Sequence, residues 1–519
     1  MALANESTEV TAWVWSDLDR WEPPHPVARA LIRGQLPWPA PGEPLPQARS
    51  PELAEVLAVA NRRWGNPVES ELEQWLAGAA VVVAGQQPGL WGGPLLSLVK
   101  VCAVAAEVAR FKALGKPAVG FFWLETRDDD LPEMGWGRVV VGGEVHEVKE
   151  SWLSGQRCAF AADLSPRSGE VLTALADQLP AAGQPALNLA LHCFAAGQPL
   201  GEACARFLAS VVRGLGVVLV DASLPALAQA AAPAALRVLH RLPAAWQALH
   251  QRAQELHALH LPPPLRLAPP QLPLFHLDGA VRRRLAVARL QEVVERLAQE
   301  PHLFSPNVWL RPLFQDAVLG TSLAILGSAE LAYHWQSQDL WHVAGVTRPQ
   351  WKLRPHVTVV GPGERRWAHQ LGLAPEEVLF PRLPRRLLEG QALQRRWTRW
   401  QERHLREFCA LAQGLGHQLP NLKGDLAATE QRLRATLGWL GGRLQHRLEE
   451  RSQVSIHRFV RLRHALRPQG QAQERALSVL APLLSLGLEF PANLVKALGE
   501  LPDPPTGMAL LYWRAGGRW

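Results

Sequence analysis

Two apolar segments of this chain each end abruptly in residues that could bind a ligand. Residues 81–84 run into a glycine-rich loop that carries the adjacent amides Gln86 and Gln87, and residues 118–124 end in the acidic run 125–130. Short apolar runs of this kind are typical of buried parallel strands, which bring the loops that follow them to one edge of a sheet. The two segments together predict an active site.

The glycine-rich loop could hold an anion or another polar ligand. Its glycines let the backbone approach a ligand closely, its amides both donate and accept hydrogen bonds, and it leads to an expected helix N-terminus, where free N–H groups favour negative charge. It matches neither a Walker loop nor a GxGxxG pattern, and a turn that serves only tight packing is the alternative. Its candidate binding residues are Gly85, Gln86, Gln87, Gly89 and Gly93.

The acidic run lies just past the carboxyl end of its strand, where open α/β sheets bind their ligands. Crowded carboxylates can hold an ammonium group or a metal, or can keep one member protonated for acid–base catalysis. The alternative is a solvated loop in which an aspartate caps a helix. Asp128 and Asp130 are the candidate catalytic carboxylates, and Thr126 beside them is a candidate binding residue.

Two later segments add polar groups. Arg311, Gln315 and Asp316 would share about a turn and a half of helix, so Arg311 could clamp a carboxylate, although a surface ion pair explains it equally well. Glu330 falls in the first turn of an expected helix, a place that the helix dipole alone explains. Tyr333, three residues on, is compatible with simple packing.

Composition limits the class of protein. A chain of 519 residues is longer than a single hydrophobic core usually supports, so two or three domains are expected. The formal charge of +7 favours acidic ligands without identifying one. No signal peptide and no bilayer-spanning apolar run is recognised, so a cytoplasmic protein without a membrane segment is expected. The histidines and the five scattered cysteines show no metal-ligand spacing, so no metal residue is assigned and a metal requirement stays open.

The elements that must position these residues form an α/β pattern. A strand from residue 79, a helix opened by Pro94 and the strand 118–124 predict a right-handed parallel crossover. Within that helix Lys100 faces away from the apolar stripe; it could contact a phosphate, but an ordinary solvent-facing lysine is expected. Further core strands are expected at 216–221, 321–327 and 357–361, and Ser328 is expected to cap the helix after the fourth of these five strands. We divide the chain into a lead-in 1–78, a core 79–380 with insertions at about 138–215 and 261–305, a helical hairpin 381–470 and C-terminal helices 471–519.

The hairpin is predicted to be an antiparallel coiled coil. Leucines recur there at three-, four- and seven-residue steps, and a bend over 414–424 is followed by two expected helices, 426–448 and 454–466. Its arginines could contact nucleic acid, but interleaved acids favour a solvated face, so no nucleic-acid partner is expected. After it, a helix over 473–486 is expected to be interrupted at Pro482.

Taken in order, these segments resemble the bacillithiol biosynthesis cysteine-adding enzymes, the BshC family. The resemblance covers most of the chain. It rests on Ala84-Gly85-Gln86-Gln87-Pro88-Gly89-Leu90 with Gly93-Pro94-Leu95, on Phe122-Trp123-Leu124 with its acidic loop, on Leu310-Arg311-Pro312 with Gln315-Asp316, on Ala329-Glu330-Leu331-Ala332-Tyr333, and on the arginine-rich hairpin followed by Gln473-Glu474-Arg475-Ala476-Leu477.

The resemblance implies a Rossmann-like core, a coiled coil that pairs two subunits into a homodimer, and a ligase that joins cysteine to glucosaminyl malate in the last step of bacillithiol biosynthesis. Amide formation needs an activated carboxyl group and a deprotonated amine, so ATP and a nearby base are expected. On this resemblance Gln86, Gln87 and Gly89 form the ligand loop. Asp128 and Asp130 hold an amine or act as base, and Arg311 meets a carboxylate.

The chain departs from the family's acidic loop, which usually reads Ser-Glu-Asp-His-Asp with a further histidine a few residues on. Asp129 and Trp136 stand where imidazoles are expected, so two groups suited to proton transfer are missing. The alternative to a ligase is therefore a binding or scaffold protein that retains the fold without the chemistry.

Overall fold

The computed structural model describes residues 16–17, 24–43, 45, 49–151, 157–267, 271–373, 377, 379, 389–501 and 507–512. The chain divides into two units, residues 1–362 with 467–519 and residues 363–466. The lead-in 1–78 and the C-terminal segment 471–519, which the sequence analysis set apart, therefore belong to the same unit as the core. The second unit begins at residue 363, whereas the hairpin was predicted to begin at residue 381.

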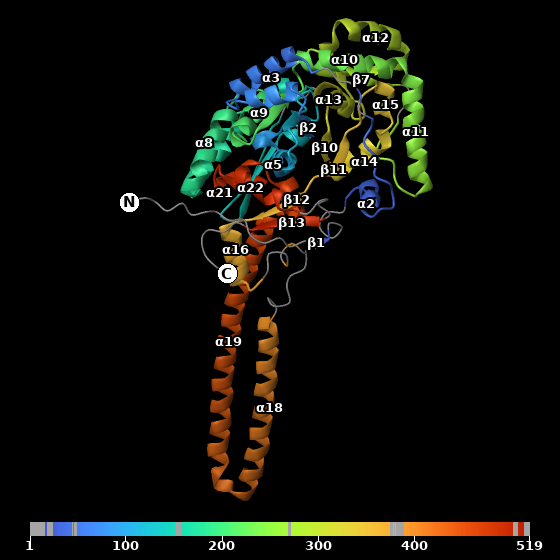
Figure 1. Ribbon diagram of the computed structural model, residues 1–519. Coiled ribbons are helices and arrows are strands. Elements are labelled where there is room, and N and C mark those ends of the chain that lie inside the picture. The colour runs from blue at the N-terminus through green and yellow to red at the C-terminus, as the bar shows by residue number, and fades with distance from the viewer. Residues whose placement is uncertain are drawn as a thin grey trace. The chain divides into compact units, whose positions relative to one another are not determined.

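A five-stranded parallel sheet forms the centre of the first unit, in the order β11-β10-β2-β3-β6 (Figure 1). The predicted α/β fold with a parallel core is confirmed. The edge strand β11 was missed because it is short and carries polar residues, so it does not read as an apolar run. The strands are β2 (Ala80–Gln86), β3 (Ala118–Leu124), β6 (Val217–Asp221), β10 (Leu323–Leu326) and β11 (Gln350–Leu353).

Alternate side chains of the central strands enter two separate cores. Val82 and Ala84 of β2 pack into one cluster, and Val81 and Val83 pack into the other. Because successive side chains of a strand point to opposite faces, a strand buried on both sides must be apolar throughout. This explains why β2 and β3 could be recognised from the sequence.

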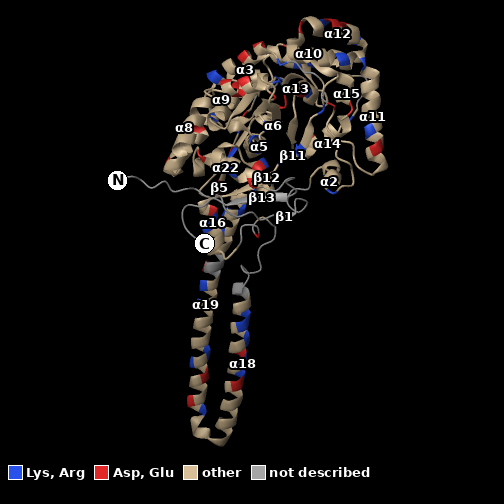
Figure 2. Ribbon diagram, in the orientation of Figure 1, with Lys and Arg blue, Asp and Glu red and all other residues tan. Residues whose placement is uncertain are grey.

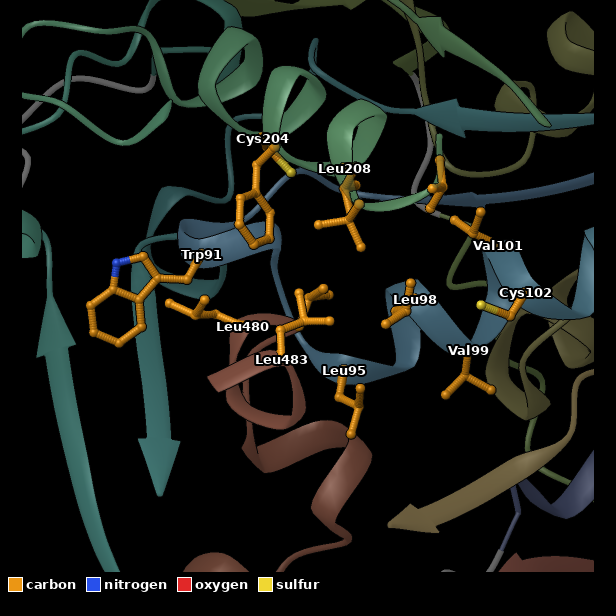
Figure 3. Close-up of a cluster of buried hydrophobic side chains, with 14 of the residues drawn as sticks. Trp91, Leu95, Leu98, Val99, Val101, Cys102, Cys204, Leu208, Leu480 and Leu483 are labelled. Carbon is orange, nitrogen blue, oxygen red and sulfur yellow. The ribbon is translucent and has the colours of Figure 1, made fainter. Parts of the chain in front are cut away.

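Helices cover both faces of the sheet. α5 (Leu95–Ala113) lies on one face, where its Leu95, Leu98 and Cys102 pack near Leu208 of α9 (Leu200–Val211) and Leu480 of α21 (Leu480–Leu486) (Figure 3). α13 (Arg311–Leu319) and α14 (Ser328–Ser337) contribute to the opposite core. The chain therefore leaves β2 toward one face and leaves β10 toward the other, so the order of connections reverses between these two neighbouring strands.

The remaining helices of the first unit complete these two cores or the insertions. They are α2 (Pro26–Ile32), α3 (Pro51–Arg63), α4 (Glu69–Leu76), α6 (Leu131–Met134), α7 (Arg167–Leu175), α8 (Gln184–Cys193), α10 (Pro225–His240), α11 (Leu242–Ala258), α12 (Leu290–Gln299), α15 (Leu340–Ala344), α20 (Gln473–Ala476) and α22 (Phe490–Gly499), and α16 (Pro362–Gln370) leads into the second unit. Pro482 lies in the first turn of α21, where no N–H is needed, so the predicted interruption at this residue is wrong.

Three smaller sheets accompany the core. β4 (Trp136–Val141) and β5 (Glu144–Lys149) form an antiparallel hairpin at the start of the first insertion. β7 (Gln271–Asp278) pairs with both β8 (Val281–Ala286) and β9 (Phe304–Pro306). The third sheet has the order β1 (Ser16–Asp17), β13 (Gly507–Tyr512), β12 (His356–Val360).

The prediction that residues 357–361 form a strand of the core sheet is wrong. β12 pairs in parallel with β13 from the C-terminal segment. Its other backbone groups are bonded by side chains of α20: Gln473 Oε1 accepts from Val359 N at 2.7 Å, and Glu474 Oε2 accepts from Val357 N at 3.0 Å. The apolar run identified a strand but could not identify which sheet it joins.

The second unit contains a helical hairpin. α18 (Glu389–Gln418) and α19 (Lys423–Leu466) run side by side and are joined by a short turn (Figure 1). The predicted break between residues 448 and 454 is wrong, because these residues include neither proline nor glycine and the helix continues through them. Basic and acidic residues alternate along both helices (Figure 2). No helix in the described part of the chain is long and apolar enough to cross a membrane.

Candidate active site

A pocket of about 350 Å³ lies at the C-terminal ends of β2, β3 and β10. Two of these strands, β2 and β10, are the neighbours at which the connections reverse, the position where open α/β sheets bind ligands. The polar residues that line it come from six elements and the loops between them. They are Gln86, Gln87, Lys100, Glu125, Glu133, Arg311, Gln315, Ser328, Glu330, Tyr333, His334, Arg354 and Arg475.

The glycine-rich loop and the acidic loop meet at this edge. β2 and β3 are in register from Ala80 to Gln86, and Gln87 Nε2 donates to Asp128 Oδ2 at 2.8 Å. Arg311 at the start of α13 lies beside the same carboxylate, with Nη1 3.1 Å from Asp128 Oδ2 and Nε 3.3 Å from Glu125 Oε2. Three segments far apart in the sequence are thus joined by one charged network.

The Asp128 carboxylate is saturated by these contacts. Its Oδ1 accepts from Asp129 N at 2.9 Å and from Arg282 Nη1 at 3.1 Å, while its Oδ2 faces Gln87 and Arg311. Burial by itself would raise the pKa of Asp128, but Arg311, Gln87 and Arg282 outweigh burial and hold the pKa below its ordinary value. This carboxylate is therefore an ionised support at neutral pH and is poorly suited to take a proton.

Lys100 forms the floor of the pocket, and the prediction that it faces solvent is wrong. It is 2% exposed, and its Nζ donates to Gly85 O at 2.7 Å, Gln86 Oε1 at 2.9 Å and Glu330 Oε1 at 2.9 Å. Burial lowers the pKa of this amine, and Glu330 opposes that effect. The first three turns of α5 are buried on nearly all sides. A lone lysine among these apolar residues therefore indicates a buried charge that needs a partner.

Glu330 has two functions that the helix dipole alone does not describe. Its Oε2 accepts from Gly327 N at 2.6 Å, which caps α14, and its carboxylate pairs with Lys100. Lys100 and the Gly327 N–H overcome the effect of burial and lower the pKa of Glu330. The predicted cap, Ser328, is the first residue of the helix and does not cap it.

Two further cations reach the pocket, one from the end of the edge strand β11 and one from the C-terminal segment. Arg354 Nη2 lies 2.7 Å from Glu474 Oε1, and His356 Nδ1 lies 2.9 Å from the same oxygen. Arg354 and Arg475 both line the pocket. Neither residue was predicted, because α20, which carries Arg475, follows the helical hairpin in sequence, and because β11, which precedes Arg354, was missed as a strand.

Two titratable groups on the pocket wall were also missed. Burial lowers the pKa of His334 to about 4, so its imidazole is neutral, and its Nδ1 donates to Glu330 O at 2.8 Å. Glu133 on α6 is exposed, but partial desolvation and the carboxylates of Asp130 and Asp128 disfavour its charge and raise its pKa. A signal for His334 was available, since it follows Glu330 by four residues and lies on the same helix face.

Several predicted site residues do not line the pocket. Gly89 and Gly93 form a tight turn in which a Cβ at Gly89 would lie 2.5 Å from Gly93 Cα, as the packing alternative proposed. Thr126 is fully buried and its hydroxyl donates to Asp221 Oδ1. Asp130 is exposed at the start of α6. Ser328 and Glu330 at the N-terminus of α14 line the pocket; Leu96 near the N-terminus of α5 lines it too, but there Leu95 N already donates to Leu477 O.

Asp316 belongs to the core behind the site. Trp341 Nε1 donates to Asp316 Oδ2 at 2.8 Å, and burial raises the pKa of the carboxyl to about 7. The folded state therefore binds this proton more tightly than the unfolded state, whose carboxyl has the ordinary pKa of 3.8. Its contribution to stability is complete below pH 3.8 and is lost as the pH rises through about 7.

Replacing Asp316 by asparagine should remove this pH dependence. Because the amide stays neutral, we expect the variant to be more stable than the wild type at pH 8, by on the order of 2 kcal/mol, and to show little advantage at pH 4. Thermal unfolding across this pH range measures the difference. If the stability of the two proteins changed with pH in the same way, that result would contradict a buried carboxyl at Asp316 that binds a proton.

Comparison with known proteins identifies the family. Residues 45–355 match the model of the bacillithiol biosynthesis BshC N-terminal Rossmann-like domain, and residues 392–505 match that of the BshC C-terminal coiled-coil domain. A Thermus thermophilus protein named "Putative cysteine ligase BshC" is 29% identical over 489 residues, which cover 89% of this chain and 94% of the relative.

Two further relatives carry the same name. The Geobacillus thermodenitrificans protein is 26% identical over 471 residues, covering 83% of each chain. The Koribacter versatilis protein is 26% identical over 495 residues, covering 87% of this chain and 88% of the relative. With both domain models matched in order along most of its length, the chain belongs to the BshC family of bacillithiol biosynthesis proteins.

Proposed function

We propose that this protein is a ligase that joins cysteine to glucosaminyl malate through an amide bond, in the last step of bacillithiol biosynthesis. Membership of the BshC family and the name of its relatives support the reaction. The observation that carries the proposal to this chain is the pocket between the ends of β2, β3 and β10, in which amides, carboxylates and cations converge. Such a mixture suits an amino-acid zwitterion beside a dicarboxylate.

The substrate charges suggest how the pocket divides. Arg354, Arg475 and Lys100 supply positive charge to the pocket, and we assign the malate carboxylates to Arg475, which is exposed, because Lys100 is already bonded to Glu330 and Arg354 to Glu474. Gln86 and Gln87 follow β2, where they can hold the cysteine carboxyl group and its activated form. Arg311 contacts the same Asp128 oxygen as Gln87, and it can stabilise negative charge that develops on the carbonyl oxygen.

The amine must lose a proton before or during attack. In an adenylating mechanism the cysteine carboxylate displaces pyrophosphate from ATP, the glucosamine nitrogen then attacks the acyl adenylate, and AMP leaves. We assign Glu133 as the base that accepts this proton. Its raised pKa and its place on the pocket wall suit this role better than the saturated carboxylate of Asp128 does. Asp130 would act through Glu133, whose pKa it raises.

ATP is the proposed source of activation. A second cavity of about 430 Å³ shares Val308 and Tyr333 with the first. Aromatic walls can stack on a base, and arginines can bind phosphates, which supports a nucleotide at this place. Its walls include Trp246, Phe275, Trp309, Arg266 and Arg284.

The purified protein should form bacillithiol from cysteine, glucosaminyl malate and ATP, detected by mass spectrometry. AMP and pyrophosphate should appear in equal amounts with the product, whereas ADP and phosphate would indicate an acyl phosphate instead. The alternative, a scaffold without chemistry, is favoured by the missing imidazoles at Asp129 and Trp136. Absence of product across several nucleotides and divalent metals would support that alternative.

We further propose that the helical hairpin pairs two copies of the chain. Exposed apolar side chains recur on α18 and α19, among them Leu411, Trp439, Leu440 and Val454, and water disfavours such a surface. Sedimentation should give twice the 57.2 kDa chain mass, and Trp439→Glu should shift the protein toward the monomer. Arg447→Gln, on the same helix, should leave the dimer intact, and a monomeric wild type would contradict the proposal.

A further inference from the structure

An inserted hairpin reaches the acidic loop from outside the parallel sheet. β8 carries three successive arginines, and Arg282 is 8% exposed whereas Arg283 and Arg284 are exposed. Arg283 has an ordinary surface partner, because its Nε lies 2.9 Å from Asp278 Oδ2. A guanidinium loses much hydration on burial, so the position of Arg282 requires specific partners.

Those partners are the acidic loop and the inserted sheet itself. Arg282 Nη1 lies 3.1 Å from Asp128 Oδ1 and 2.9 Å from Asp129 Oδ1, and its Nη2 donates to Pro306 O at 3.2 Å. The guanidinium also lies over the ring of Phe275, 4.0 Å from its centroid. Two carboxylates and one carbonyl oxygen therefore bind the guanidinium nitrogens, and the ring of Phe275 packs against one face of the group.

Asp128 connects Arg282 to the pocket. Its Oδ1 meets Arg282, and its Oδ2 meets Gln87 and Arg311, both of which line the pocket. Arg282 itself is not a lining residue of this pocket. A change at Arg282 can therefore reach this pocket by moving the Asp128 carboxylate and the two side chains that it orients.

The inserted sheet holds the same region at a second place. Arg127 Nη1 donates to Phe304 O at 2.9 Å, so two arginines bond carbonyl groups of β9. Asn307 follows β9 directly, and its Oδ1 accepts from Leu310 N at 3.2 Å, just before Arg311 begins α13. The acidic loop, the inserted sheet and the helix that carries Arg311 are thus bonded as one piece.

We propose that Arg282 is a positioning residue for the ligation reaction: it fixes Asp128 so that Gln87 and Arg311 face the substrate, with Asp129 as its second anchor. The expected effect on kinetics rests on the proposed function, whereas the contacts of Arg282 do not. Asp129 then serves as an ionic anchor in this chain and not as a proton carrier.

Steady-state kinetics of Arg282→Gln test the proposal. Since misplacing reacting groups by about 1 Å can cost a factor of about 100, we expect kcat/KM to fall about 100-fold, with kcat lowered and KM for glucosaminyl malate raised. Arg282→Lys keeps one charge but not the two-pronged contact, so it should recover about a tenth of wild-type kcat/KM. Arg283→Gln, the matched surface control, should behave as the wild type.

Crystal structures of the Arg282→Gln and Arg282→Lys variants provide a readout that needs no activity. The proposal predicts that the contacts of Asp128 with Gln87 and Arg311 lengthen beyond hydrogen-bond distance in the glutamine variant. Unchanged contacts, or a glutamine variant within twofold of wild-type kcat/KM, would overturn it. If the wild type forms no product, the proposed function fails, but the crystal structures still test whether Arg282 positions Asp128. If the glutamine variant does not fold, the lysine variant is used for the same comparison.

Discussion

Arg311→Gln should lower kcat/KM for bacillithiol formation by about 100- to 1000-fold, the range seen when a preorganised group that stabilises developing charge is removed. The guanidinium lies between two carboxylates, 3.3 Å from Glu125 and 3.1 Å from Asp128, and it lines the pocket. Its removal takes the ion pair from Glu125 and one of two arginines from Asp128, which keeps Arg282, and it takes positive charge from the reacting centre.

Matched variants separate charge from geometry at this position. Arg311→Lys keeps the charge but cannot contact both carboxylates with one planar group, so it should have an intermediate kcat/KM. Arg289→Gln removes an arginine whose partner, Glu292, is on the surface, and it should leave the kinetics unchanged. An Arg311→Gln enzyme within threefold of the wild type would show that this network does not serve catalysis.

Lys100→Met should destabilise the first unit by about 3–5 kcal/mol, the usual cost of removing one partner from a buried ion pair. The substitution retains an apolar stem of similar length, so it creates little empty space. It leaves Glu330 without its cation and leaves Gly85 O and Gln86 Oε1 without a donor. Calorimetric unfolding of the full chain measures the loss.

The double variant Lys100→Met with Glu330→Gln should recover part of that stability, because it no longer buries an unpaired charge. Lys112→Met on the exposed end of the same helix should change stability by less than about 0.5 kcal/mol. Equal unfolding temperatures for Lys100→Met and Lys112→Met would contradict the buried pair.

Local patterns predicted the elements that carry the site. The all-apolar run of β3 indicated a strand buried on both faces, and the acidic residues that follow it had to lie at the edge of the sheet. Because β2 and β3 pair in parallel, Gln87 and Asp128 meet at that edge. The hairpin β4–β5 and the helices α18 and α19 were recognisable for the same reason, since their periodicity is local.

Contacts between distant segments could not be predicted in this way. Nothing near Lys100 in sequence indicates Glu330, and nothing near Arg282 indicates Asp128, because each pair is formed by topology and not by spacing. Likewise Arg475 reaches the pocket because α20 folds back on the first unit, and Arg354 reaches it because it follows β11, an edge strand that the sequence did not reveal. Asp316 was misassigned because a helical residue five positions from Arg311 faces a different side of the helix.

The central claim is that one pocket at the ends of β2, β3 and β10 holds the substrates. A crystal structure of the wild-type protein with glucosaminyl malate and cysteine tests it most directly. The account predicts a malate carboxylate beside Arg475, and the cysteine carboxyl group within hydrogen-bond distance of Gln86 or Gln87. Ligands bound elsewhere on the chain, with this pocket empty at saturating concentrations, would contradict it.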